Sequence, residues 1–245
     1  MIYSRNEFTR IRIYILVTSF VAWVTIVALP FWLGPELPVF MCGSRWTQGS
    51  TVNWMLSVSG GWMLMIVAMM APISLPPLFH IRISSFSDRQ WRSASLFLIG
   101  YLTIWFITCL AMKALEAVVN QDMQNGHFQA WVTVFIACLW QVSPLKQRCL
   151  NQCHNHRPLA AFGWRADIDV LRFGLEHGMW CLGSCWALML FAESLSQWHI
   201  AGMVIVALIM FCERLDPPMR PDWRLRGFRT ASLHLHHSLS VSRHA

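Results

Sequence analysis

Charged residues are scarce in this chain: Asp, Glu, Lys and Arg make up 13% of its 245 residues. A soluble domain carries about 25%, so the composition argues against a soluble protein and for a membrane protein. The sequence also lacks three motifs that mark common enzyme active sites, namely a glycine-rich phosphate loop, Gly-x-Ser-x-Gly and His-Glu-x-x-His. We therefore expect no enzymatic activity.

The sequence also predicts neither a cleavable signal peptide nor a disulfide framework. The apolar run that follows Arg5, Arg10 and Arg12 ends in Leu-Pro-Phe-Trp-Leu-Gly-Pro, without a small-residue cleavage site, so we interpret it as an uncleaved first span. Of the eight cysteines, only Cys42 lies in a loop predicted outside the cell, which excludes an extracellular disulfide scaffold.

Apolar residues are abundant, at 56% of the chain, and they gather in six runs that we predict to be membrane-spanning helices. Many of the 14 tryptophans fall near the ends of these runs, as in an interfacial aromatic belt. The fourth run is short for a span of roughly 20 residues. The runs cover about 11–33, 53–73, 93–115, 128–142, 170–192 and 197–212.

Basic residues alternate between the connections. Seventeen of the 19 Lys and Arg residues belong to the N-terminal segment, the second and fourth connections and the tail, counting Arg12 and Arg172 at the edges of their runs, whereas Arg45 in the first connection and Lys113 at the end of the third run belong to the opposite side. This positive-inside pattern places both termini in the cytoplasm. We predict an all-α, polytopic membrane bundle of about six transmembrane helices over 1–215, with a basic cytoplasmic tail over 216–245 that is disordered or lies on the bilayer. Dispersed basic residues do not form one patch, so we expect no nucleic-acid partner.

The fifth run carries polar and sulfur side chains at helical spacing. His177, Cys181 and Cys185 are four residues apart and would share one face of a helix. Soft sulfur and borderline nitrogen on one buried stripe favour a thiophilic metal such as Cu(I). Gly174 and Gly178 form a small-xxx-small pair that would let a second helix approach closely. The alternative is that His177 is a hydrogen-bonded packing residue.

The second run is rich in methionine. Met65 and Met69 would share a face, and thioethers bind Cu(I) well but hard cations poorly. Methionines that fill irregular gaps between helices are the alternative. Pro72 at the end of the run should free a backbone carbonyl near Ala68 and bend the helix there.

A second pair of thiols follows the fourth run. Ser143 and Pro144 predict the cap and first turn of a helix, on which Cys149 and Cys153 would share a face at the reducing cytosolic side. Nearby Lys146 and Arg148 should favour the thiolate form of these cysteines. The alternative is a pair of packing thiols.

Glu176 lies roughly 9 Å inside the cytosolic edge of the fifth run, and an intramembrane carboxylate is a candidate functional group. Arg172, one turn earlier, is its predicted partner. A small proton-coupled transporter that uses Glu176 and His177 is therefore an alternative function.

Three motifs in this order resemble a known family. They are Trp62 to Pro72, similar to W-x-x-M-x-x-A-M-M-x-P; Pro144 to Cys153, similar to P-L-K-x-x-C-L-x-x-C; and Gly174 to Met189, similar to G-x-x-H-G-x-x-C-x-G-C-C-W-x-L-M. The family is the predicted metal-binding integral membrane proteins, known as domain of unknown function 2182. Ser184 stands where the family has the first of two adjacent cysteines.

The resemblance implies a copper chaperone of the bacterial cell inner membrane that delivers Cu(I) to a partner such as a copper-dependent oxidase. Together with the residue patterns, it gives a predicted ligand set with Cu(I) as the bound species. The ligands are Cys149, Cys153, His177, Cys181, Cys185, Met65 and Met69. A non-catalytic membrane assembly subunit, whose glycine and methionine faces only pack partner helices, is a further alternative.

Overall fold

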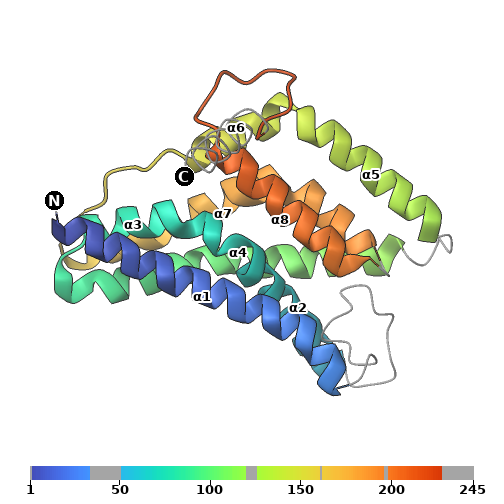
Figure 1. The fold of residues 1–245 in the computed structure, drawn as a ribbon, viewed down its shortest axis with the longest axis horizontal. Coiled ribbons are helices and arrows are strands. Elements are labelled where there is room, and N and C mark those ends of the chain that lie inside the picture. The colour runs from blue at the N-terminus through green and yellow to red at the C-terminus, as the bar shows by residue number, and fades with distance from the viewer. Residues whose placement is uncertain (1, 34–50, 120–125, 161, 196–197, 228–245) are drawn as a thin grey trace, which may run out of the picture.

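A computed structural model describes residues 2–33, 51–119, 126–160, 162–195 and 198–227 of the protein (Figure 1). All regular secondary structure in these ranges is helical, which confirms the predicted all-α class. The elements are α1 (Ile2–Leu33), α2 (Thr51–Met70), η1 (Pro72–Ser74), α3 (Leu75–Ser84), η2 (Ser87–Arg89), α4 (Gln90–Val119), α5 (Gly126–Val142), α6 (Pro144–Cys153), α7 (Gly163–Ser194) and α8 (His199–Leu215).

Each of the six apolar runs forms a helix, but fewer than six helices meet the length and hydropathy of a membrane span. Within the described residues, Phe8–Ala28 and Ser87–Met112 do so, and the bent pair Ser59–Met70 and Pro72–Ser84 is a third if it counts as one span. The predicted six spans are therefore not reached. α5 and α8 have 17 residues each, or about 25 Å of helix, and the first half of α7 carries several charged residues.

The bend predicted at Pro72 is confirmed. The axes of the two helical pieces on either side of residue 71 differ by 56°. Proline has no N–H to offer the carbonyl four residues earlier, and the Ala68 carbonyl instead accepts a hydrogen bond of 2.7 Å from the Ser19 hydroxyl of α1. The bend therefore comes with a specific contact between α1 and α2.

Helix α7 lies at the centre of the packing and contacts α4, α5, α6 and α8. Glycines allow its close approach to α4. A Cβ atom at Gly100 would lie 2.6 Å from the Leu171 carbonyl oxygen, and one at Gly174 would clash with the Phe97 carbonyl. At Gly178 a Cβ would lie 3.1 Å from Ile104. The prediction that Gly174 and Gly178 admit a neighbouring helix is thus confirmed, and the neighbour is α4.

The short helix α6 begins as predicted, with Pro144 in its first turn and the Ser143 hydroxyl accepting a hydrogen bond from the backbone N–H of Leu145. The chain after α8 returns to this helix: the Asn151 side chain bonds both backbone groups of Met219. The predicted basic tail therefore begins as an irregular segment on α6. Residues 228–245 lie outside the described ranges, and the disorder of the tail stays a prediction.

The glycine contacts predict a stability difference between two helical glycines. Gly174→Ala should lower the free energy of unfolding by about 1–3 kcal/mol, because the added methyl group meets backbone of α4 that cannot move aside easily. Gly60→Ala is the matched control, since its Cβ would meet nothing within 4 Å, and its better helix propensity should add about 0.5–1 kcal/mol. Thermal unfolding of the purified variants measures both changes; equal midpoints would contradict the assigned contact.

Candidate metal centre

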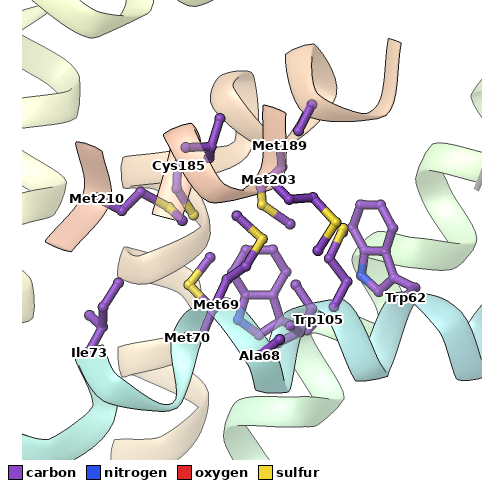
Figure 2. Close-up of a cluster of buried hydrophobic side chains, with 14 of the residues drawn as sticks. Trp62, Ala68, Met69, Met70, Ile73, Trp105, Cys185, Met189, Met203 and Met210 are labelled. Atoms are coloured by element: carbon purple, nitrogen blue, oxygen red, sulfur yellow. The ribbon is translucent and has the colours of Figure 1, made fainter. Parts of the chain in front are cut away.

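The core where α2, α7 and α8 meet is unusually rich in sulfur. Figure 2 shows the side chains of Met69, Met70, Met203, Met210 and Cys185 converging there, with Trp62 and Trp105 beside them. All of these side chains are buried. Methionine and cysteine side chains are polarisable and fill irregular spaces, so their presence in a core does not by itself indicate a metal site. The arrangement of four of them around one cavity is stronger evidence for such a site.

A small cavity of about 10 Å³, with room for about one water-sized species, lies in this core. Two thiols, from Cys181 and Cys185, and two thioethers, from Met70 and Met210, line it. The sulfur atoms of Cys181 and Met70 are 4.0 Å apart. The other lining residues are Ile73, Leu150, Ser184, Glu213 and Arg214.

Hydrogen bonds hold the thiols of α7 in place. The Tyr101 hydroxyl of α4 lies 3.3 Å from the Cys181 sulfur. The Cys185 thiol donates to the Cys181 backbone carbonyl at 3.0 Å, and the Ser184 hydroxyl donates to the same carbonyl at 2.7 Å. These contacts fix the positions of both sulfur atoms at the cavity.

The structure brings some of the predicted ligands together and separates others. Cys181 and Cys185 line the cavity, but Met65 and Met69, although buried in the same core, do not. Met70 and Met210 take their place. Met70 belongs to the methionine run already singled out, whereas Met210 stands in an ordinary apolar helix whose sequence gave no signal beyond the thioether itself.

His177 lies elsewhere on the buried face of α7. Its ring is surrounded by the rings of Phe97, Tyr101 and Phe173, with centroids 5.8–6.0 Å away. It lines a second, larger cavity of about 110 Å³ together with Glu176, and not the sulfur-lined one. The predicted stripe of His177, Cys181 and Cys185 is therefore buried along its length but divided between two cavities.

The two cysteines of α6 lie beside the sulfur-lined cavity. Cys153 is buried and Cys149 half-buried, and the Cys149 sulfur packs 2.7 Å from the position that a Cβ at Gly183 would take. Of the α6 residues, Leu150 alone lines the cavity. The side chain between the two cysteines thus forms part of the wall.

The prediction that Lys146 and Arg148 favour thiolates on α6 is wrong. Burial raises the pKa of Cys149, and it raises the pKa of Cys153 to about 12. Lys146 is buried and pairs with Glu213, with 2.6 Å between Nζ and Oε1. Desolvation of the thiols therefore outweighs the basic residues in the sequence around them.

The predicted ion pair of Glu176 is confirmed. Its carboxylate accepts from Arg172 at 2.9 Å and also pairs with Arg157 at 3.2 Å. The Glu176 side chain is 40% exposed, so it forms a surface ion-pair network at the start of the apolar part of α7. Such a network needs no proton-coupled role.

Within the described residues, no three His, Cys, Asp or Glu side chains gather as a metal-binding group. The sulfur-lined cavity has two cysteines and completes its donor set with thioethers, while the carboxylate that also lines it, Glu213, is paired with Lys146. This combination is unsuitable for hard cations and suitable for a soft monovalent ion.

Residues 59–234 match the family described as PpoB2, copper chaperone. The chain belongs to this copper chaperone family. The expectation of a copper-chaperone-like protein is thereby confirmed, and the association with copper follows from the family. No curated protein and no solved structure matches the chain.

The reactivity of the α6 thiols in this member of the copper chaperone family can be measured by alkylation. Because alkylation needs the thiolate, a pKa of about 12 predicts that Cys153 reacts with iodoacetamide about a thousandfold more slowly at pH 8 than in the unfolded chain. The rate should rise with pH up to about 12. Mass spectrometry of timed reactions quantifies the modification, and equal rates in the folded and denatured protein would contradict the burial of this thiol.

Proposed function

We propose that the protein is an integral membrane chaperone that receives Cu(I) at α6, holds it in the sulfur-lined cavity and delivers it to a copper-dependent partner such as an oxidase. The observation that carries this proposal is the convergence of two thiols and two thioethers, from three helices, on a cavity of about 10 Å³. The role is binding and transfer rather than catalysis.

The donor set supports Cu(I) as the cargo. Thiolate and thioether ligands select Cu(I) over hard cations. Cys181 and Cys185 would hold the ion, with Met70 and Met210 in the place that sequence analysis assigned to Met65 and Met69. His177 packs beside the site and would not coordinate the same ion.

The placement of α6 supports an entry role for Cys149 and Cys153. The Cys149 sulfur packs against α7 at Gly183, Cys153 is buried, and Leu150 between them in the sequence lines the cavity. A short displacement of this side chain would connect the two pairs. Copper would then pass from Cys149 and Cys153 to Cys181 and Cys185 by exchange of sulfur ligands.

Two surface features support a multi-pass location in the bacterial inner membrane. Large apolar side chains are exposed along helices α1, α4 and α8, among them Phe20, Ile99 and Leu208, and a bilayer is the solvent that suits them. Exposed tryptophans stand at the beginnings of α4 and α7, at Trp91 and Trp164, where an interfacial belt would place them. In this proposal α1, α4 and the bent pair α2–α3 cross the bilayer.

Contacts between the connections that are rich in basic residues support the proposal that these connections all lie on the cytosolic side of the membrane. Arg89 and Arg92, which follow α3, both pair with Asp167 at the start of α7, at 2.5 and 2.7 Å. His80 of α3 bonds the Arg157 carbonyl of the α6–α7 connection at 3.0 Å. Segments that the positive-inside pattern assigns to one side thus lie together.

The first test removes both cavity thiols. Cys181→Ser with Cys185→Ser should reduce Cu(I) that co-purifies under reducing conditions to background, because serine is a poor ligand for a soft ion. The matched control is Cys109→Ser with Cys138→Ser, which changes two cysteines that do not line the cavity and should keep the wild-type copper content. Elemental analysis gives the metal-to-protein ratio, and thermal unfolding verifies that each variant is folded.

Two outcomes would refute the assignment. Unchanged copper in the cavity double variant would place the ion elsewhere. A wild-type protein that binds no Cu(I) but forms a stable complex with other membrane proteins would favour the assembly-subunit alternative.

A second test adds a ligand. Ser184 lines the cavity, so Ser184→Cys should place a third thiol there and lower the Kd for Cu(I) about tenfold or more. Ser93→Cys is the matched control, since Ser93 is buried on α4 away from the cavity. Competition with a colorimetric Cu(I) chelator measures both affinities; an unchanged Kd for Ser184→Cys would argue against coordination at this cavity.

A further inference from the structure

Two charged residues of α8 line the sulfur-lined cavity, and one of them is already neutralised. Glu213 pairs with Lys146 at 2.6 Å and also accepts a hydrogen bond from Gln141. The side chains of Lys146 and Glu213 are 1% and 2% exposed. This pair therefore contributes no net charge to the cavity.

The other residue, Arg214, has a buried donor without a partner. Its Nη2 atom is inaccessible to solvent and makes no hydrogen bond within the described part of the chain. Its backbone is engaged separately, because the Arg214 carbonyl is bonded by His154 Nε2 at 3.1 Å. The Arg214 guanidinium also lies against the thiols of Cys181 and Cys153. Buried guanidinium donors are almost always paired, so a charged group beside these thiols with its Nη2 donor still unbonded points to an occupant that carries negative charge.

Charge counting identifies which loaded state meets this requirement. Two thiolates with one Cu(I) carry a net charge of −1, whereas two thiolates with a divalent ion such as Zn²⁺ are neutral. Adding the guanidinium of Arg214 makes the Cu(I) site neutral and leaves the Zn²⁺ site with a charge of +1. In a buried, low-dielectric site an uncompensated charge is strongly unfavourable.

We propose that Arg214 is the charge partner of the loaded site and makes it selective for a monovalent over a divalent metal ion. This inference rests on the proposed function, because it assigns Cys181 and Cys185 as the ligands. Arg214 acts as a positioning residue: it touches the cavity and balances the bis-thiolate ion without coordinating the metal. The Tyr101 hydroxyl, 3.3 Å from the Cys181 sulfur, is a neutral donor and cannot supply this balance.

The experiment compares two metals in variants that remove or keep the charge. Arg214→Gln and Arg214→Met should weaken Cu(I) binding about tenfold or more while Zn²⁺ binding stays the same or tightens, so that the ratio of the two affinities falls. Arg214→Lys keeps the charge and should hold this ratio within about threefold of wild type. Competition with a Cu(I) chelator and with a Zn²⁺ indicator, on purified full-length protein under reducing conditions, gives the two affinities.

Arg226→Gln is the matched control. Arg226 is also buried, but it bonds the Pro217 carbonyl and Asn151 and does not line the cavity. It should leave the ratio of Cu(I) to Zn²⁺ affinity unchanged even if it lowers the unfolding midpoint.

The outcomes separate this inference from the proposed function. An equal loss of affinity for both metals in Arg214→Gln would show that Arg214 has only a structural role, and an unchanged affinity for both would show that it has no role. Either result overturns the inference, whereas Cu(I) binding by the wild type still supports the proposed function. If the wild type binds no Cu(I), both fail. If Arg214→Gln and Arg214→Met do not fold, Arg214→Lys provides the test. A fall of about tenfold or more in its ratio of Cu(I) to Zn²⁺ affinity would overturn the inference, because this variant keeps the charge.

Discussion

The close approach of α7 to α4 is the constraint on which the candidate site depends. Gly100 and Gly174 remove the side chains that would hold the two backbones apart. Cys181 and Cys185 follow Gly174 and Gly178 on the same stripe of α7, so the packing that seats the glycines also buries the thiols. It brings the Tyr101 hydroxyl of α4 to the Cys181 sulfur. A separation larger by the width of a methyl group would loosen this contact.

The bend at residue 71 positions the residues that α2 and η1 contribute to the wall of the sulfur-lined cavity. A straight continuation of α2 would carry the chain beyond Met70 away from its present course, whereas the 56° change in direction leaves Met70 and Ile73 both at the cavity. The Ser19 hydroxyl bonds the carbonyl of Ala68, which Pro72 leaves without its helical donor. A backbone defect is thus stabilised by α1, and it positions a thioether against Cys181.

Much of this arrangement could be predicted from sequence because it depends on local spacing. Long apolar runs predicted six of the helices, Ser143 and Pro144 gave the start of α6, and the four-residue spacing of Cys181 and Cys185 gave their shared face. The two methionines that line the cavity could not be chosen in this way. Met65, Met69 and Met70 all lie within two turns of one helix and are all buried in the core, and only tertiary packing decides which one lines the cavity. Met210 comes from a helix far along the chain, and no local pattern marks it.

The state of the α6 thiols shows a second limit of sequence reasoning. Lys146 lies near Cys149 in sequence, but its side chain is taken up by Glu213 of α8, and burial then raises the pKa of Cys149 and Cys153. In the proposed function this has a consequence for transfer. A thiol with a raised pKa must lose its proton before it binds copper, so in this proposal copper binding by the α6 pair would release protons and would weaken as the pH falls. Transfer would then proceed toward the cavity lined by Leu150, where four sulfur-bearing side chains meet, two of them thioethers that have no proton to lose.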